Sequence, residues 1–172
     1  FEDLEIGARR ALFILEVEIE QRESQPYSVS ARDFYDSGQL VQAMVKYRTI
    51  VNKFPRCARG VTAKEGTLKL ASRFLDEMDD LKSKSLDNIA MDRAIVARTL
   101  LDLVEENLLK NILSVSELAW IHELRTEDGN PSTLPNREAY LTDLLTQLRK
   151  RLPANMPEKK IIDEDSNNGG ND

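Results

Sequence analysis

The spacing of small and aromatic residues between Ser24 and Cys57 constrains the fold of this chain more than any other feature. Small residues let two antiparallel helices approach closely, while aromatic residues fill the space between them. A glycine stands where a first helix would end and a proline where a second would end, which are the positions that tolerate these residues best. The stretch therefore predicts a two-helix hairpin. The residues that define it are Tyr27, Ala31, Phe34, Gly38, Ala43, Tyr47 and Pro55.

This spacing is similar to the 34-residue tetratricopeptide repeat, with Ser30 in place of the usual leucine. We therefore expect an all-α fold in which tetratricopeptide-like antiparallel hairpins stack as a short right-handed solenoid. The first helix should begin near Pro26, with Ser24 or Gln25 as its N-cap.

Three parts are expected along the chain: an N-terminal helix over residues 1–23, a helical-repeat domain over 24–156 and a disordered acidic tail over 157–172. The first part also fits a half-buried strand, since apolar residues alternate with glutamates near its end. We favour a helix because no second strand is available for pairing. The helical spacing places Leu4, Ala8, Ala11, Leu15 and Ile19 on one face, with Arg9, Glu16 and Glu20 turned outward.

Further helices follow the hairpin. Residues 58–81 read as one long helix, 116–125 as a short helix and 137–152 as the last helix, which follows a loop of turn residues over 126–136. These patterns extend the all-α interpretation to most of the chain.

The strongest periodic signal is an apolar stripe within residues 90–115. Its members recur at alternating steps of four and three: Ala90, Ala94, Ala97, Leu101, Val104 and Leu108. Alanine at successive positions favours close packing against another helix of the same chain. The alternative is a self-associating helical bundle or coiled coil that uses this stripe as its seam and extends it through Ile112 and Val115.

Several classes of function are disfavoured by the composition. A formal net charge of −6 over 172 residues, without a concentrated basic face, argues against a nucleic-acid partner. His122 is the only histidine and Cys57 the only cysteine, so a two-histidine metal site cannot be built within this chain. No phosphate-binding glycine loop or hydrolase motif occurs. No apolar run approaches the roughly 20 residues that a membrane span needs.

The acidic cluster Asp76, Glu77, Asp79 and Asp80 is interpreted as a solvated face rather than as a pair of catalytic carboxylates. We therefore expect no enzymatic activity, no cofactor and no metal ion in this chain. Because it begins at Phe1 rather than methionine, we also expect it to be a fragment or a processed product.

Beyond the generic repeat, residues 30–156 resemble the helical-repeat region of the aspartyl/asparaginyl beta-hydroxylase family. The segments that carry this resemblance are Gly38-Gln39-Leu40-Val41-Gln42-Ala43, Lys53-Phe54-Pro55-Arg56-Cys57-Ala58-Arg59, Arg93-Ala94-Ile95 and Leu144-Leu145-Thr146-Gln147-Leu148, with Leu152-Pro153-Ala154-Asn155 after it.

The resemblance implies a membrane-anchored parent protein of the endoplasmic reticulum. Its separate catalytic domain would use Fe(II) and 2-oxoglutarate to hydroxylate Asp and Asn in EGF-like domains. This chain lacks the family's iron-binding histidines, and its acidic tail stands where further repeats would follow. No catalytic residue is therefore carried over.

The expected function is a non-catalytic scaffold that binds a protein or peptide, including EGF-like-domain substrates of the parent enzyme. First helices of such repeats line the concave groove, which makes Ser28, Arg32 and Tyr35 the groove candidates. The alternative interpretation of Arg32 and Tyr35 is ordinary exposed helix surface. The expected location is the endoplasmic reticulum by resemblance, and the cytoplasm if the resemblance fails.

Overall fold

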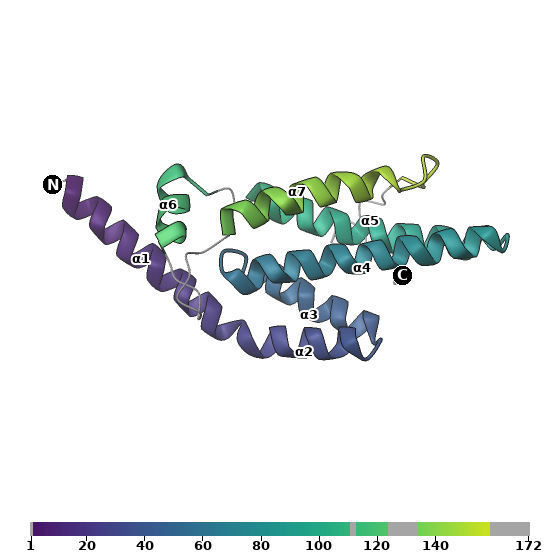
Figure 1. Cartoon of the computed structure of the whole chain (residues 1–172), viewed down its shortest axis with the longest axis horizontal. Helices are drawn as coiled ribbons and strands as arrows, with labels where there is room; N and C mark the ends of the chain where they lie inside the picture. Colours follow the sequence, from purple (N-terminus) through teal and green to yellow (C-terminus); the bar gives the residue numbers. More distant parts are fainter. Residues whose placement is uncertain (1, 111–112, 124–133, 159–172) are drawn as a thin grey trace, which may run out of the picture.

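The computed structural model describes residues 2–110, 113–123 and 134–158. These residues form seven α-helices and no strand, so the all-α prediction is confirmed (Figure 1). The helices are α1 (Glu2–Glu23), α2 (Gln25–Asp36), α3 (Leu40–Lys53), α4 (Ala58–Ser83), α5 (Asp87–Lys110), α6 (Val115–Glu123) and α7 (Leu134–Lys150). None of them is both long and apolar enough to cross a membrane within the part of the chain that the structure describes.

The junction between α1 and α2 is nearly continuous at Ser24. The Ser24 amide donates to the carbonyl of Glu20 at 2.9 Å, and the Ser28 amide donates to the carbonyl of Ser24 at 3.0 Å. Ser24 itself has helical dihedrals and makes no side-chain cap hydrogen bond. Ser24 therefore occupies the predicted N-cap position, but its side chain makes no cap hydrogen bond, because α1 already supplies carbonyl acceptors for the first amides of α2.

The turn between α2 and α3 forms as the sequence predicts. Gly38 has a φ of 78°, a left-handed conformation that glycine adopts without a Cβ clash. The Gly38 amide donates to the carbonyl of Tyr35 at 3.1 Å, and the Gln39 amide donates to the carbonyl of Phe34 at 2.9 Å. These two bonds close the end of α2 as a Schellman motif.

Small and aromatic residues hold the two helices of this hairpin together. Ala31 and Ala43 are completely buried, so α2 and α3 approach closely. The Tyr27 ring lies 5.9 Å from the Phe54 ring, at the point where α3 ends before Pro55. The hairpin prediction thus rests on contacts that the structure shows directly.

The long helices α4 and α5 form a second antiparallel hairpin. The apolar stripe predicted on α5 faces the interior, and Ala90, Ala94, Ala97, Leu101 and Val104 are all completely buried. α5 also reaches the first hairpin, where the amide nitrogen of Asn107 donates to the carbonyl of Val51 at 2.7 Å.

A dimer seam along this stripe would have to displace helices of the same chain. Of the proposed continuation, Ile112 lies outside the described residues, and Val115 is 87% exposed at the start of α6. The stripe from Ala90 to Val104 therefore packs within the chain, and self-association stays a prediction.

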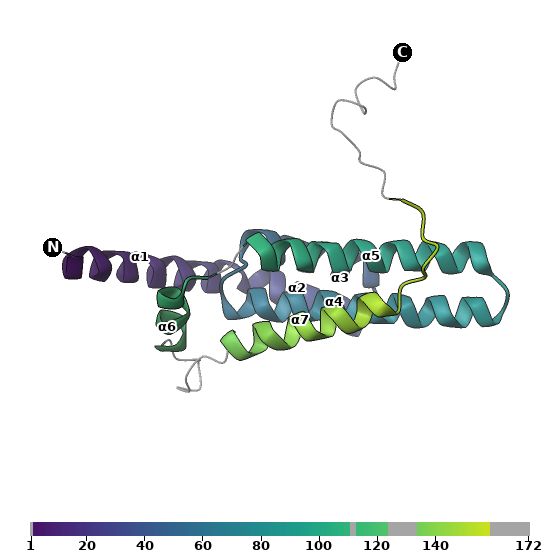
Figure 2. The ribbon, with the colours of Figure 1, turned by 90° about the horizontal axis from the view of Figure 1, so that it is seen from above.

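The last helix, α7, lies along α4 and α5 (Figure 2). Three leucines on one of its faces, Leu141, Leu145 and Leu148, are buried against them. After α7 the chain turns back across α5, where the guanidinium of Arg98 donates to the carbonyl of Pro157 at 2.8 Å. Most of the predicted loop at 126–136 and of the predicted tail lies outside the described residues.

The burial of α1 differs from the prediction. Leu4, Leu15 and Ile19, predicted on one apolar face, are 78%, 51% and 39% exposed. The opposite face, which carries Phe13 and Val17, is the one that is buried. The prediction that these residues share one face of the helix is correct, but the rest of the protein covers the opposite face.

A stabilising substitution is expected at Ser85, which lies in the turn just after α4 and its C-cap residue Lys84. Ser85 has a φ of 59°, and the amide of the following residue, Leu86, donates to the carbonyl of Leu81 at 2.9 Å. Ser85→Gly should raise the free energy of unfolding by about 0.5–1 kcal/mol, because glycine relieves the left-handed strain while it adds some chain entropy. Urea unfolding tests this. The matched control Ser83→Gly, in the right-handed last turn, should lower stability instead.

A close approach between Gly66 of α4 and Tyr47 of α3 generates a second prediction. A Cβ on Gly66 would lie 2.6 Å from the Tyr47 ring. Gly66→Ala should therefore lower the free energy of unfolding by about 1–3 kcal/mol. In a Tyr47→Ala background the same change should cost little, and additive effects in this double-mutant cycle would contradict the assignment. Gly7→Ala, with no atom near the added methyl group, serves as the control.

Candidate functional site

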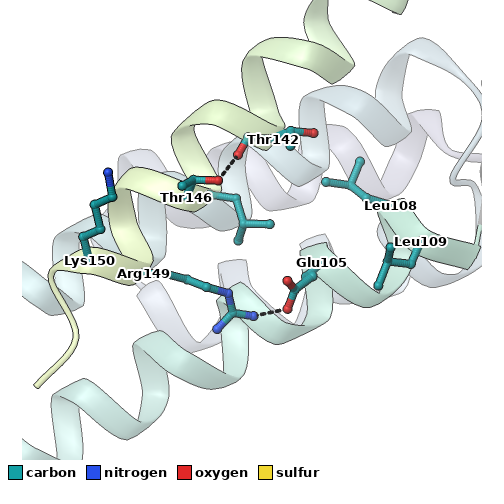
Figure 3. Close-up of a pocket in the computed structure, with 8 residues that line it drawn as sticks. Glu105, Leu108, Leu109, Thr142, Thr146, Arg149 and Lys150 are labelled. Atoms are coloured by element: carbon teal, nitrogen blue, oxygen red, sulfur yellow. Dashed lines mark hydrogen bonds and ion pairs between the residues drawn. The ribbon is translucent and has the colours of Figure 1, made fainter. Parts of the chain in front are cut away.

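A hollow between α5 and α7 is the best candidate for a binding site (Figure 3). Its volume is about 570 Å³. Side chains from the C-terminal half of each helix face each other across the gap. The lining residues are Glu105, Leu108, Leu109, Thr142, Leu145, Thr146, Arg149 and Lys150.

Three leucines make the interior of this hollow apolar. Leu145 is buried, Leu108 is half-buried and Leu109 is 66% exposed. A leucine exposed to this degree beside two partly covered ones leaves apolar surface in contact with water, which favours binding of another apolar group. The hydroxyl proton of Thr146 is already used within the helix, because the hydroxyl donates to the Thr142 carbonyl at 3.0 Å.

Arg149 bounds one end of the hollow and ties α7 to α5. Its guanidinium lies 2.7 Å from the carboxylate of Asp102 and also pairs with Glu105. Burial disfavours the charged form, but the bonds to these two carboxylates outweigh it and raise the pKa of Arg149. The arginine thus stays charged and defines a fixed polar rim.

Ion pairs at both ends of α7 set its position against α4. Arg137 lies 2.9 Å from Glu65, and Arg151, just beyond α7, lies 2.7 Å from Asp76 and 3.1 Å from Asp79. The acidic cluster at the end of α4 is therefore exposed, but its members are paired rather than only solvated. The other two members of the cluster are also paired: Glu77 lies 3.0 Å from Arg93, and Asp80 lies 3.0 Å from Lys84.

Lys64 makes the most buried of these contacts, with a side chain only 2% exposed. Its ammonium group lies 2.9 Å from Glu138 of α7 and donates to the carbonyl of Pro55 at 3.2 Å. A buried charge is tolerated only when such partners replace its water. Sequence reasoning missed Lys64 because nothing local distinguishes it from an exposed lysine in a helix.

The groove residues expected from the sequence occupy α2, away from the α5–α7 hollow. Ser28 is half-buried, and the side chain of Arg32 is 83% exposed and lies 3.9 Å from Asp36. Tyr35 is half-buried, with the guanidinium of Arg73 at 6.0 Å over its ring. None of the three lines the α5–α7 hollow.

A second hollow, of about 410 Å³, lies between α1 and α6. The rings of Phe13 and Trp120 pack 5.7 Å apart beside it. Arg56 bridges Glu16 at 3.0 Å and Glu20 at 2.7 Å, so Glu20 is buried rather than turned outward as predicted. These contacts hold α1 to the rest of the chain, and the mixture of paired charges makes this hollow a weaker candidate for an apolar ligand.

Cys57 has the environment of a packing residue. It is completely buried, and its thiol donates to the carbonyl of Phe54 at 3.4 Å. Burial raises the pKa of the thiol above its usual value, which disfavours the reactive thiolate. Among the described residues, no three His, Cys, Asp or Glu side chains are grouped so that they could hold a metal ion.

Acid should weaken the attachment of α7 to α4 through Glu65. Burial would raise the pKa of this carboxyl, but the hydrogen bond from Arg137 and the charge of Lys69 outweigh it and lower the pKa. Because the pKa is depressed in the folded state, the stabilisation is complete above the unfolded value of about 4.3 and is lost as pH falls through the folded value.

The free energy of unfolding, measured by urea titration at a series of acidic pH values, should therefore fall below about pH 4.3. Glu65→Gln should flatten this fall, and Arg137→Met should do the same by removing the partner. Parallel pH profiles for these variants and the wild type would contradict the assignment.

Comparisons with known proteins do not place this chain in a family. No family model, no curated protein and no solved structure matches it. The resemblance to the hydroxylase repeat region therefore stays a prediction from the sequence, and the assignment of a function rests on the geometry of the chain itself.

Proposed function

We propose that this chain is a non-catalytic helical-repeat scaffold for protein–protein interaction, with tetratricopeptide-like hairpins stacked as a short solenoid. The order of its helix contacts supports this proposal. α2 packs against α3, α3 against α4, and α4 against α5, while α7 contacts both helices of the preceding hairpin. Successive contacts of this kind are typical of repeat proteins, in which each unit packs on its neighbour.

The observation that carries the proposal is the position of α7. It contacts both α4 and α5, as the first helix of a further hairpin would, and residues 151–158 after it do not form a helix. No helix of the described residues covers the hollow that opens between α7 and α5. A hollow bounded by two helices and lined by leucines suits an amphipathic helix, whose apolar residues recur every three or four positions.

The same proposal includes a parent protein related to the aspartyl/asparaginyl beta-hydroxylases, in the endoplasmic reticulum. It rests on the sequence segments quoted above. In that setting the scaffold would position polypeptide substrates, such as EGF-like domains, for a separate catalytic domain.

Selection from a phage-displayed library of amphipathic helical peptides tests the scaffold function. Leu109→Glu should lower the affinity for the selected peptides by about 100-fold, because an unpaired carboxylate would be buried beneath a bound peptide. Val41→Glu is the matched control: Val41 is 62% exposed on α3, away from the hollow, and its replacement should leave affinity unchanged. Isothermal titration calorimetry measures both.

Two outcomes contradict parts of this proposal. If Arg32→Ala with Tyr35→Ala removes binding while Leu109→Glu retains it, the site is the α2 face expected from the sequence. If no peptide is selected by the folded chain, the scaffold function itself is wrong.

A further inference from the structure

We propose that α7 detaches from the α4–α5 hairpin as one unit while that hairpin stays folded, and that the buried pair of Lys64 with Glu138 controls this step. We call this pair the latch. One of the two walls of the α5–α7 hollow belongs to α7, so release of α7 removes the hollow. The consequence for binding rests on the proposed function, whereas the latch itself needs no ligand.

The burial of α7 is much smaller than that of the two helices beneath it. Among residues 137–150 the buried side chains are Leu141, Leu145 and Leu148, which form a single row. Buried residues run along α4 from position 60 to 78 and along α5 from 90 to 107. The element with the fewest buried apolar contacts opens at the lowest free energy, so α7 should open before the hairpin does.

Most polar contacts of α7 also oppose its release only weakly. Arg137, Arg149 and Arg151 pair with carboxylates of α4 and α5. The paired side chains are 24–69% exposed, so they keep part of their water in the docked state and regain the rest on release. Exposed pairs of this kind stabilise a docked helix very little.

Lys64 is different because its side chain is only 2% exposed. Its ammonium group lies 2.9 Å from the carboxylate of Glu138 and 3.2 Å from the carbonyl of Pro55. The carbonyl is neutral, so Glu138 supplies the balancing negative charge. A buried charge that loses its counter-ion is strongly destabilising. The chain can avoid this cost by releasing α7, since release opens the side of Lys64 that Glu138 covers.

The two members of the latch should respond differently to substitution. The side chain of Glu138 is 31% exposed, so it stays hydrated if Lys64 is removed. Lys64 has no such access to water if Glu138 is removed. Loss of Glu138 should therefore release α7, whereas loss of Lys64 should not. An ordinary exposed ion pair would show no such asymmetry.

Amide hydrogen exchange of the full 172-residue chain measures the release directly. A single helix as short as α7 is marginal in water once it has left its neighbours, so its amides exchange whenever it detaches. In the wild type, amides of residues 141–148 should exchange at least about 10-fold faster than those in the centres of α4 and α5.

Three variants test the latch. Glu138→Met should speed exchange of residues 141–148 by about 100-fold and leave exchange in α4 and α5 unchanged, because it leaves Lys64 buried without a counter-ion. Lys64→Met should stay within about 5-fold of the wild type. The double variant should do the same, since two methionines replace the pair by apolar groups of similar length.

Arg151→Met is the matched control. It removes ion pairs between the opposite end of α7 and α4, at a side chain that is 34% exposed. Exchange of residues 141–148 should change by less than about 5-fold, as expected for an exposed pair. Circular dichroism and urea unfolding check that each variant folds.

Three results would overturn the inference. The first is a wild type in which α7 exchanges no faster than α4 and α5. The second is Lys64→Met speeding exchange as much as Glu138→Met does. The third is a Glu138→Met chain that loses structure throughout, since the latch leaves the hairpin folded. If the variants behave as expected but no library peptide is selected, the latch stands and the scaffold function is wrong.

Discussion

Close packing around α4 is the constraint on which the rest of the structure depends. This helix contacts its hairpin partner α5, α3 of the first hairpin and α7, and it is buried along most of its length. Such close packing of helices is possible only where side chains are small or where buried charged groups are paired. Gly66 admits the ring of Tyr47, and Lys64 replaces its lost water with Glu138 and the carbonyl of Pro55.

The attachment of α7 shows which contacts hold the candidate site in place. Exposed ion pairs contribute only about 0–1 kcal/mol each, so the pairs of Arg151 with Asp76 and Asp79 add little by themselves. Leu141, Leu145 and Leu148 supply the apolar burial, and the Lys64–Glu138 pair joins α4 to α7 near the start of α7. The hollow beside Leu109 is a consequence, because α7 is held against α4 and α5 with one side left uncovered.

The burial of α1 shows which properties of a helix its amphipathic pattern predicts and which it does not. Its apolar spacing predicted a helix and grouped Leu4, Leu15 and Ile19 on one face, and both statements agree with the structure. The pattern did not reveal that Phe13 and Val17 on the other side are the buried residues. When a helix has two apolar sides, the rest of the chain can pack against either of them. Which side is buried depends on residues such as Trp120 and Arg56, which lie far away in the sequence.

The sequence by itself determined the helices and the first hairpin. Helical periodicity, the left-handed glycine at Gly38 and the break at Pro55 act through neighbouring residues, so they can be read without knowledge of the fold. Tertiary structure alone decided the candidate site. Lys64 and Glu138 are 74 positions apart, and the leucines of the α5–α7 hollow come from two separate helices. Burial and pairing at such distances depend on how helices stack, which local spacing does not specify.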